Sequence, residues 1–168
     1  IPVMGVVPWL KDKFPPEDSL DLLENKSRIT NPEIKVGIIK LPSISNFSDF
    51  DPLENEDSII IEWIKTSQNL YQFDFLILPG SKQTIKDQIF LEECGLCQDI
   101  REYSNNKGHI IGICGGLQML GTTLKDPFFK EGSKTFSDQK IKGIGLLPLK
   151  TTFTKKKLTR QINSKSLW

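Results

Sequence analysis

Short apolar runs alternate with polar, turn-forming stretches along most of this 168-residue chain. Buried strands have about 4 to 8 residues and favour β-branched and aromatic side chains. A longer polar and apolar periodicity over 87–105, interrupted near Gly95, predicts one helix or two short ones. The runs that predict strands lie at 34–40, 58–65, 74–78 and from His109 onward, with two more expected at 141–148 and 149–153.

This alternation of strands with helices predicts an α/β fold, with a mostly parallel sheet covered by helices on both faces. Ligands of such sheets bind beyond the carboxyl ends of the strands. We expect Pro79-Gly80 and Cys114 to lie at two such ends. A site built from both segments is therefore expected at this edge of the sheet.

The first 33 residues differ in composition from the rest of the chain. A strand-like run at 1–8 is followed by a polar, Pro-rich stretch, 9–32, in which a short helix is expected at 19–25. Such a composition is typical of a connector between domains. We therefore expect a boundary near residue 33, with a new domain over 34–168.

The most informative segment is 112–121, with the sequence GICGGLQMLG. Gly-x-Cys-x-Gly is the cysteine form of the nucleophile elbow, a sharp turn from a strand into a helix. We expect side chains at 112 or 116 to collide with the neighbouring strand and helix. Leucines at 117, 120 and 124 have helical spacing and predict the helix behind the turn. A buried structural cysteine in a Gly-rich turn is the alternative interpretation of Cys114.

An exposed cysteine at such a turn suits acyl transfer, in which the sulfur attacks a carbonyl carbon. The oxyanion that develops needs preorganised N–H donors. The N–H of Gly115 follows the nucleophile, as in the serine elbow, and the loop at Gly80 is the expected source of the second donor. Glycine there allows the backbone to approach a substrate closely.

A nucleophilic cysteine also needs a base, and His109 is the one histidine in the sequence. It precedes Cys114 by five residues on an extended strand, which separates the two by about 16 Å at ~3.3 Å per residue. A catalytic hydrogen bond spans about 3 Å. We therefore expect His109 to be the first residue of a strand, and the sequence offers a nucleophile without a base.

Composition and charge limit the classes of partner that the chain is expected to have. The chain is 38% hydrophobic and 26% charged with a net charge of +1, so we expect a globular domain without a nucleic-acid or membrane partner. No run reaches the ~20 apolar residues of a membrane span, and a cytoplasmic location is expected.

Cys94-x-x-Cys97 has no second pair at zinc-ligand spacing, so no metal site is expected. We expect a solvated strand edge rather than an anion site at the late basic cluster, Lys150, Lys155, Lys156, Lys157, Arg160 and Lys165.

Three separated motifs carry a resemblance to a known family. The segments 112–121 and 78–82 (LPGSK) resemble the class I, triad-type glutamine amidotransferases. The segment 41–53 (LPSISNFSDFDPL), together with 5–10 and 16–20, is similar to the cobyric acid synthase family within that class. These synthases hydrolyse glutamine and amidate adenosylcobyrinic a,c-diamide to adenosylcobyric acid, a step of cobalamin biosynthesis.

The resemblance implies a flavodoxin-like fold and a role for each matching residue. Cys114 would attack the glutamine side-chain amide, form a γ-glutamyl thioester and release ammonia. Gly80 and Gly115 would donate to the oxyanion, and Gln118 would help to seat the glutamine. ATP and Mg²⁺ would bind in a preceding synthetase domain, whose end and linker would be 1–33, and no cofactor is expected in this chain.

The sequence departs from the family in two respects. No Gly-x-x-x-x-Gly-Lys-Ser/Thr phosphate loop is present, and the family's catalytic histidine, which follows the last strands, has no counterpart before Trp168. We therefore expect a fragment or the product of a degenerating gene, with an amidotransferase domain over 34–168 that is incomplete at its C-terminus and inactive alone. Two alternatives stay open. One is another class I amidotransferase such as cobyrinic acid a,c-diamide synthase, although the sequence of the loop at 44–47 argues against it. The other is a non-catalytic flavodoxin-like binding module.

Overall fold

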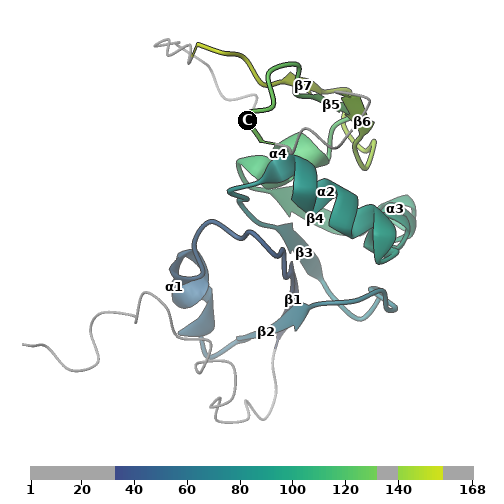
Figure 1. The fold of residues 1–168 in the computed structure, drawn as a ribbon. Coiled ribbons are helices and arrows are strands. Elements are labelled where there is room, and N and C mark those ends of the chain that lie inside the picture. Colours follow the sequence, from purple (N-terminus) through teal and green to yellow (C-terminus); the bar gives the residue numbers. More distant parts are fainter. Residues whose placement is uncertain (1–32, 132–139, 157–168) are drawn as a thin grey trace, which may run out of the picture.

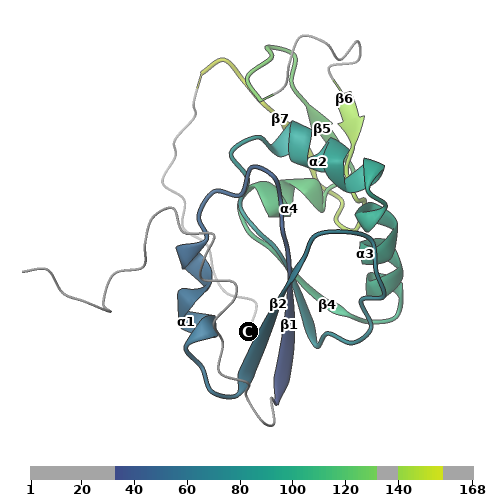
Figure 2. The same ribbon diagram turned by 60° about the horizontal axis from the view of Figure 1, so that its bottom comes forward.

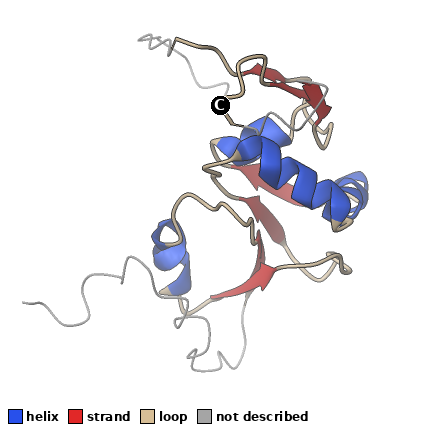
Figure 3. Ribbon diagram, viewed as in Figure 1, coloured by secondary structure: helices blue, strands red, loops and turns tan. Residues whose placement is uncertain are grey.

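A four-stranded parallel sheet forms the centre of the structure, a computed structural model that describes residues 33–131 and 140–156. Its strand order is β2-β1-β3-β4 (Figures 1 and 3). The expected strands at 34–40, 58–65, 74–78 and from His109 are confirmed. Their observed bounds are β1 (Ile34–Ile39), β2 (Ile59–Ile64), β3 (Phe75–Leu78) and β4 (His109–Gly112).

Helices lie on both faces of this sheet, as predicted. The connection from β1 to β2 and the connection from β3 to β4 run in opposite directions across the sheet, so right-handed crossovers place their helices on opposite faces. Figure 2 shows α1 on one side of the strands and α2 and α3 on the other. The helices are α1 (Asp51–Glu54), α2 (Thr84–Glu93), α3 (Leu96–Asn105) and α4 (Gly115–Met119), with a 3₁₀ turn at Ser48–Phe50 before α1.

The interruption expected near Gly95 is confirmed, because α2 and α3 meet at this residue with φ of 84°. Only glycine adopts this left-handed conformation without strain.

The predicted start of the helix at Asp87 is wrong by three residues. The first N–H of α2, that of Thr84, donates to the Glu131 carboxylate at 2.9 Å, so the partner that caps this helix lies far away in the sequence.

A second, three-stranded sheet follows α4, in the order β6-β5-β7. The strand expected at 149–153 is confirmed as β7, whereas the extent expected for the other, 141–148, is wrong, because β6 ends at Lys142. Neither strand joins the parallel sheet. The N–H groups of Ile144 and Leu146 instead donate to the Met119 and Leu120 carbonyls at the end of α4, at 2.8 and 2.9 Å. The strands are β5 (Thr123–Lys125), β6 (Lys140–Lys142) and β7 (Lys150–Thr152).

The helix predicted from leucines 117, 120 and 124 is also shorter than expected. Helix α4 ends at Met119, and Leu124 lies in β5, where its side chain is fully buried. Leu124 and Ile144 belong to the same apolar cluster as the main sheet. The second sheet therefore shares the core of the first, and this shared core holds α4 in place.

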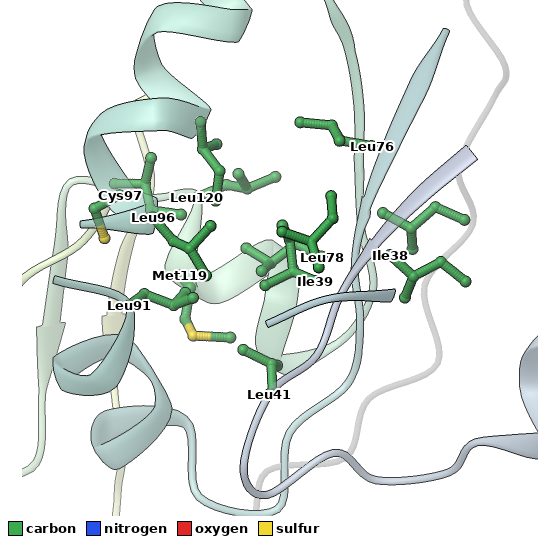
Figure 4. Close-up of a cluster of buried hydrophobic side chains, with 14 of the residues drawn as sticks. Ile38, Ile39, Leu41, Leu76, Leu78, Leu91, Leu96, Cys97, Met119 and Leu120 are labelled. Atoms are coloured by element: carbon green, nitrogen blue, oxygen red, sulfur yellow. The ribbon is translucent and has the colours of Figure 1, made fainter. Parts of the chain in front are cut away.

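The core lies mainly between the parallel sheet and helices α2, α3 and α4. Figure 4 shows a cluster of its buried side chains, to which β1, β3 and all three helices contribute. Because β1 pairs with β2 on one side and β3 on the other, its side chains are buried on both faces, as in other parallel sheets. The side chains labelled in the figure are Ile38, Ile39, Leu41, Leu76, Leu78, Leu91, Leu96, Cys97, Met119 and Leu120.

Several expectations concern residues outside the described ranges. These are the strand at 1–8, the helix at 19–25 and three members of the basic cluster, Lys157, Arg160 and Lys165. The other three, Lys150, Lys155 and Lys156, are exposed, and Lys150 begins the edge strand β7. Within 33–131 and 140–156, no helix has the length and apolar character needed to cross a membrane.

Candidate active site

The chain turns sharply at Cys114, between the end of β4 and the start of α4. Cys114 has φ of 48° and ψ of −108°, and its side chain is exposed. A positive φ costs a non-glycine residue of order 1–3 kcal/mol and occurs most often at functional sites. The predicted strand-to-helix corner is thus confirmed, and the alternative of a buried structural cysteine is excluded by the exposure of its side chain.

The glycines on either side make this corner possible. A β-carbon at Gly112 would lie 2.6 Å from Leu120 Cδ1 and 2.8 Å from Leu117 Cα. A β-carbon at Gly116 would overlap the Leu78 carbonyl oxygen and lie 2.7 Å from its carbon. These are the collisions predicted from the sequence, with a neighbouring helix in one case and a neighbouring strand in the other.

The loop after β3 lies beside the cysteine. A β-carbon at Gly80 would lie 3.9 Å from Cys114 Cβ, and one at Gly115 would lie 3.0 Å from the Ser81 nitrogen. The Ile113 N–H donates to the Leu78 carbonyl at 2.9 Å, which joins the two segments. Cys114, Gly80 and Gly115 are therefore brought together at the carboxyl ends of β3 and β4, where the sequence placed them.

Two serines of the loop after β1 complete the wall of the site, and the sequence interpretation did not single them out. The Ser45 N–H donates to the Gly80 carbonyl at 2.9 Å, and the Lys82 N–H donates to the Ser43 carbonyl at 2.8 Å. The signal that could have found this loop is its position after β1, because carboxyl ends of adjacent parallel strands meet at one edge. Ser43 and Ser45 thus position the Gly80 loop from the side opposite to Cys114.

A buried carboxylate anchors both loops to α2. Asp87 is fully buried and accepts hydrogen bonds from the Ser81 hydroxyl at 2.6 Å and the Ser43 N–H at 3.1 Å. Burial raises the pKa of Asp87 above its ordinary value, and the bonds from Ser81 and Ser43 oppose this shift in part. No local pattern marks this residue, because Ser43 lies 44 positions away in the chain.

Gln118 and His109 lie at different distances from the corner. Gln118 is half-buried and follows Cys114 by one helical turn, and its N–H donates to the Cys114 carbonyl at 3.2 Å. His109 begins β4 and stacks on Phe75, with ring centroids 5.3 Å apart. The strand separates His109 from Cys114, as expected, so these two residues do not meet.

The remaining cysteines lie away from the site. Cys97 is buried in the first turn of α3, where the Gln88 amide donates to its sulfur at 3.3 Å. Burial, with a smaller contribution from Glu92, raises the pKa of Cys97 to about 12. Cys94 lies just beyond α2 and is half-buried. Within the described residues, no three histidine, cysteine or acidic side chains are grouped so that they could hold a metal ion.

A flavodoxin-like parallel sheet with a cysteine elbow is the framework of a glutamine amidotransferase domain. Residues 35–168 match the family described as the CobB/CobQ-like glutamine amidotransferase domain, and the chain belongs to this family. Within the family it is similar to cobyric acid synthases, so the resemblance read from the sequence is confirmed. The cobyric acid synthases of Prochlorococcus marinus strains MIT 9312 and MIT 9301 are 82% and 79% identical to it over 168 residues.

The alignment covers all of this chain and 33% of each relative, so the chain spans about a third of the length of the curated relatives that it matches. Among solved structures, PurLQS from Thermotoga maritima aligns with a TM-score of 0.47 at 16% identity, over 58% of this chain and 51% of that chain.

Proposed function

We propose that this chain supplies the glutaminase part of cobyric acid synthase, with Cys114 as the nucleophile. The observation that carries the proposal is the exposed cysteine at a strained strand-to-helix corner, beside the Gly80 loop. The sulfur attacks the side-chain carbonyl carbon of glutamine and forms a tetrahedral intermediate. The N–H groups of Gly80 and Gly115 stabilise its oxyanion, and collapse of the intermediate gives a γ-glutamyl thioester and ammonia.

Gln118 is proposed to seat the glutamine, since a residue one turn after Cys114 lies on the same face of α4. Protonation of the leaving nitrogen needs a general acid, and hydrolysis of the thioester needs a general base, and both must lie close to Cys114. His109 is held away from the corner by β4. We therefore propose that Cys114 in the 168-residue chain reacts with a chloroketone analogue of glutamine, whereas the chain does not turn glutamine over by itself.

The ammonia is proposed to amidate carboxylates of adenosylcobyrinic a,c-diamide and so to yield adenosylcobyric acid. This ligase step takes ATP with Mg²⁺, which we assign to a separate synthetase domain rather than to this chain. In this proposal, 1–33 are the end of that domain and a linker, and 34–168 form the amidotransferase domain. The chain is proposed to act in the cytoplasm, without a nucleic-acid or membrane partner.

A chloroketone analogue of glutamine tests the central step. We expect the full chain to be alkylated once, at Cys114, as measured by intact mass and peptide mapping, and glutamine to protect it. The Cys114→Ser variant is the control, and it should stay unlabelled. Absence of labelling in the folded chain would refute the proposal in favour of a non-catalytic binding module.

The Gly80→Ala variant examines the close approach of substrate to the Gly80 backbone. The added β-carbon would lie 3.2 Å from Ser45 Oγ and 3.9 Å from Cys114 Cβ, so it fits without a severe collision but fills the space beside Cys114. We expect labelling to slow at least about tenfold, with the urea midpoint of unfolding nearly unchanged. Because alanine keeps the backbone N–H, labelling at the wild-type rate would show instead that no reacting group approaches the space beside residue 80.

A further inference from the structure

Three serines lie around the Gly80 loop, and two of them are hydrogen-bonded to the same carboxylate. The Ser81 hydroxyl donates to Asp87 at 2.6 Å, and the Ser43 N–H donates to Asp87 at 3.1 Å. Ser45 is half-buried, and no described residue is hydrogen-bonded to its hydroxyl. The Ser45 hydroxyl thus keeps its donor and acceptor capacity for a ligand.

The position of this hydroxyl is set by its own backbone. The Ser45 N–H donates to the Gly80 carbonyl at 2.9 Å, within an isolated bridge that pairs Ile44 with Ser81. Ser45 Oγ lies 3.2 Å, and Cys114 Cβ 3.9 Å, from the point where a β-carbon on Gly80 would stand. The hydroxyl and the sulfur-bearing residue therefore flank the same small space, which is open because residue 80 is glycine.

A primary carboxamide placed at this corner has two polar groups, one that accepts hydrogen bonds and one that donates them. Its oxygen accepts hydrogen bonds and suits the backbone N–H groups, whereas its NH₂ group needs an acceptor. The Gly80 carbonyl already accepts the Ser45 N–H. A hydroxyl oxygen has two acceptor lone pairs, and the Ser45 hydroxyl, 3.2 Å from the point where a β-carbon on Gly80 would stand, is such an oxygen beside Cys114.

We propose that Ser45 binds the NH₂ group of the substrate carboxamide, by accepting one of its N–H groups at the hydroxyl oxygen. This inference rests on the proposed glutaminase function and adds the residue that recognises the nitrogen to be released. Ser45 thereby orients the carboxamide with its oxygen toward Gly80 and Gly115. It also favours an amide over a ligand that lacks the NH₂ group.

The chloroketone offers a sharp test, because it carries a CH₂Cl group where glutamine has NH₂. In the full chain, a Ser45→Ala variant should be alkylated at Cys114 at the wild-type rate. The glutamine concentration that halves this rate should rise about fivefold, as expected for the loss of one hydrogen bond. The matched control is Ser48→Ala in the same loop, where the lost hydroxyl donates to Asn46 Oδ1 at 2.8 Å; it should leave both quantities unchanged.

Each other outcome has a distinct meaning. Unchanged protection by glutamine in Ser45→Ala would overturn the role of Ser45 while leaving the nucleophile in place. Equal weakening of alkylation and of protection would show that Ser45 shapes the loop rather than binds NH₂, and would overturn the inference as well. Absence of labelling or of glutamine protection in the wild-type chain would instead overturn the proposed function, and this inference with it.

Discussion

The corner that presents Cys114 depends on the missing side chain at Gly116, and the Gly116→Ala variant measures that dependence. The added β-carbon would overlap the Leu78 carbonyl oxygen and lie 2.7 Å from the Pro79 oxygen. These are backbone atoms at a strand end, and they cannot turn aside as a flexible side chain can. The Leu78 oxygen also accepts the Ile113 N–H at 2.9 Å, so relief of the overlap weakens a bond between the two segments that form the site.

The expected cost follows from these contacts. Overpacking costs about 1–3 kcal/mol, and the weakened hydrogen bond adds about 1 kcal/mol. The gain in helix propensity from glycine to alanine returns less than about 1 kcal/mol. We therefore expect the free energy of unfolding to fall by about 3 kcal/mol, with a decrease in melting temperature of roughly 6–12 °C for a chain of this size.

Urea denaturation followed by circular dichroism measures this loss, and chloroketone labelling of Cys114 reports the geometry of the corner. The matched control is Gly145→Ala, where φ is 87° but no atom lies within 4 Å of the added β-carbon. Backbone strain alone should cost about 1–2 kcal/mol there, with labelling unchanged. If Gly116→Ala unfolds within about 0.5 kcal/mol of the wild type, the steric reasoning about the elbow is refuted.

Two further predictions follow from buried titratable groups. The pKa of Asp87 is raised in the folded chain above 3.8, so folding favours the protonated carboxyl group. The stability that this protonated group contributes is lost as pH rises from about 4 through the raised pKa. The wild type should therefore lose stability relative to Asp87→Asn over this range in urea titrations at successive pH values; a difference independent of pH would contradict the raised pKa. Cys97, with a pKa of about 12, should resist iodoacetamide at pH 8 in the native chain while the exposed Cys114 is modified, as peptide mapping after alkylation would show. Modification of Cys97 as fast as Cys114 would contradict its burial.

Much of the local structure could be predicted from the sequence. Short apolar runs predict β1, β2 and β3 because these strands lie in a parallel sheet, where β1 and β3 are buried over most of their length and β2, at the edge, is mostly half-buried. The elbow could be predicted for a different reason, since glycines at 112 and 116 are required by atoms that any strand and helix would place there. The same reasoning located the Gly80 loop, because the ends of parallel strands meet at one edge of the sheet.

The segment between β6 and β7 could not be predicted from periodicity. The apolar residues at 144–147 have the composition of a strand, yet their N–H groups donate to carbonyls at the end of α4. The start of α2 was missed for a similar reason, because its first N–H donates to Glu131 rather than to a nearby capping side chain. In both cases the hydrogen-bond acceptor lies on another element, so the local sequence pattern does not predict the structure.

The sequence by itself determined the sharp corner at Cys114, the glycines that permit it and the parallel sheet that carries it, because these depend on residue type and short-range sterics. Tertiary structure alone decided that Asp87 is a buried anchor for two loops. It also decided that the Ser81 hydroxyl donates to Asp87, whereas the hydroxyl of Ser45 has no hydrogen-bond partner among the described residues. The physical reason is that burial and hydrogen-bond pairing depend on which strand ends are adjacent in space, and the folding of the whole chain sets this adjacency.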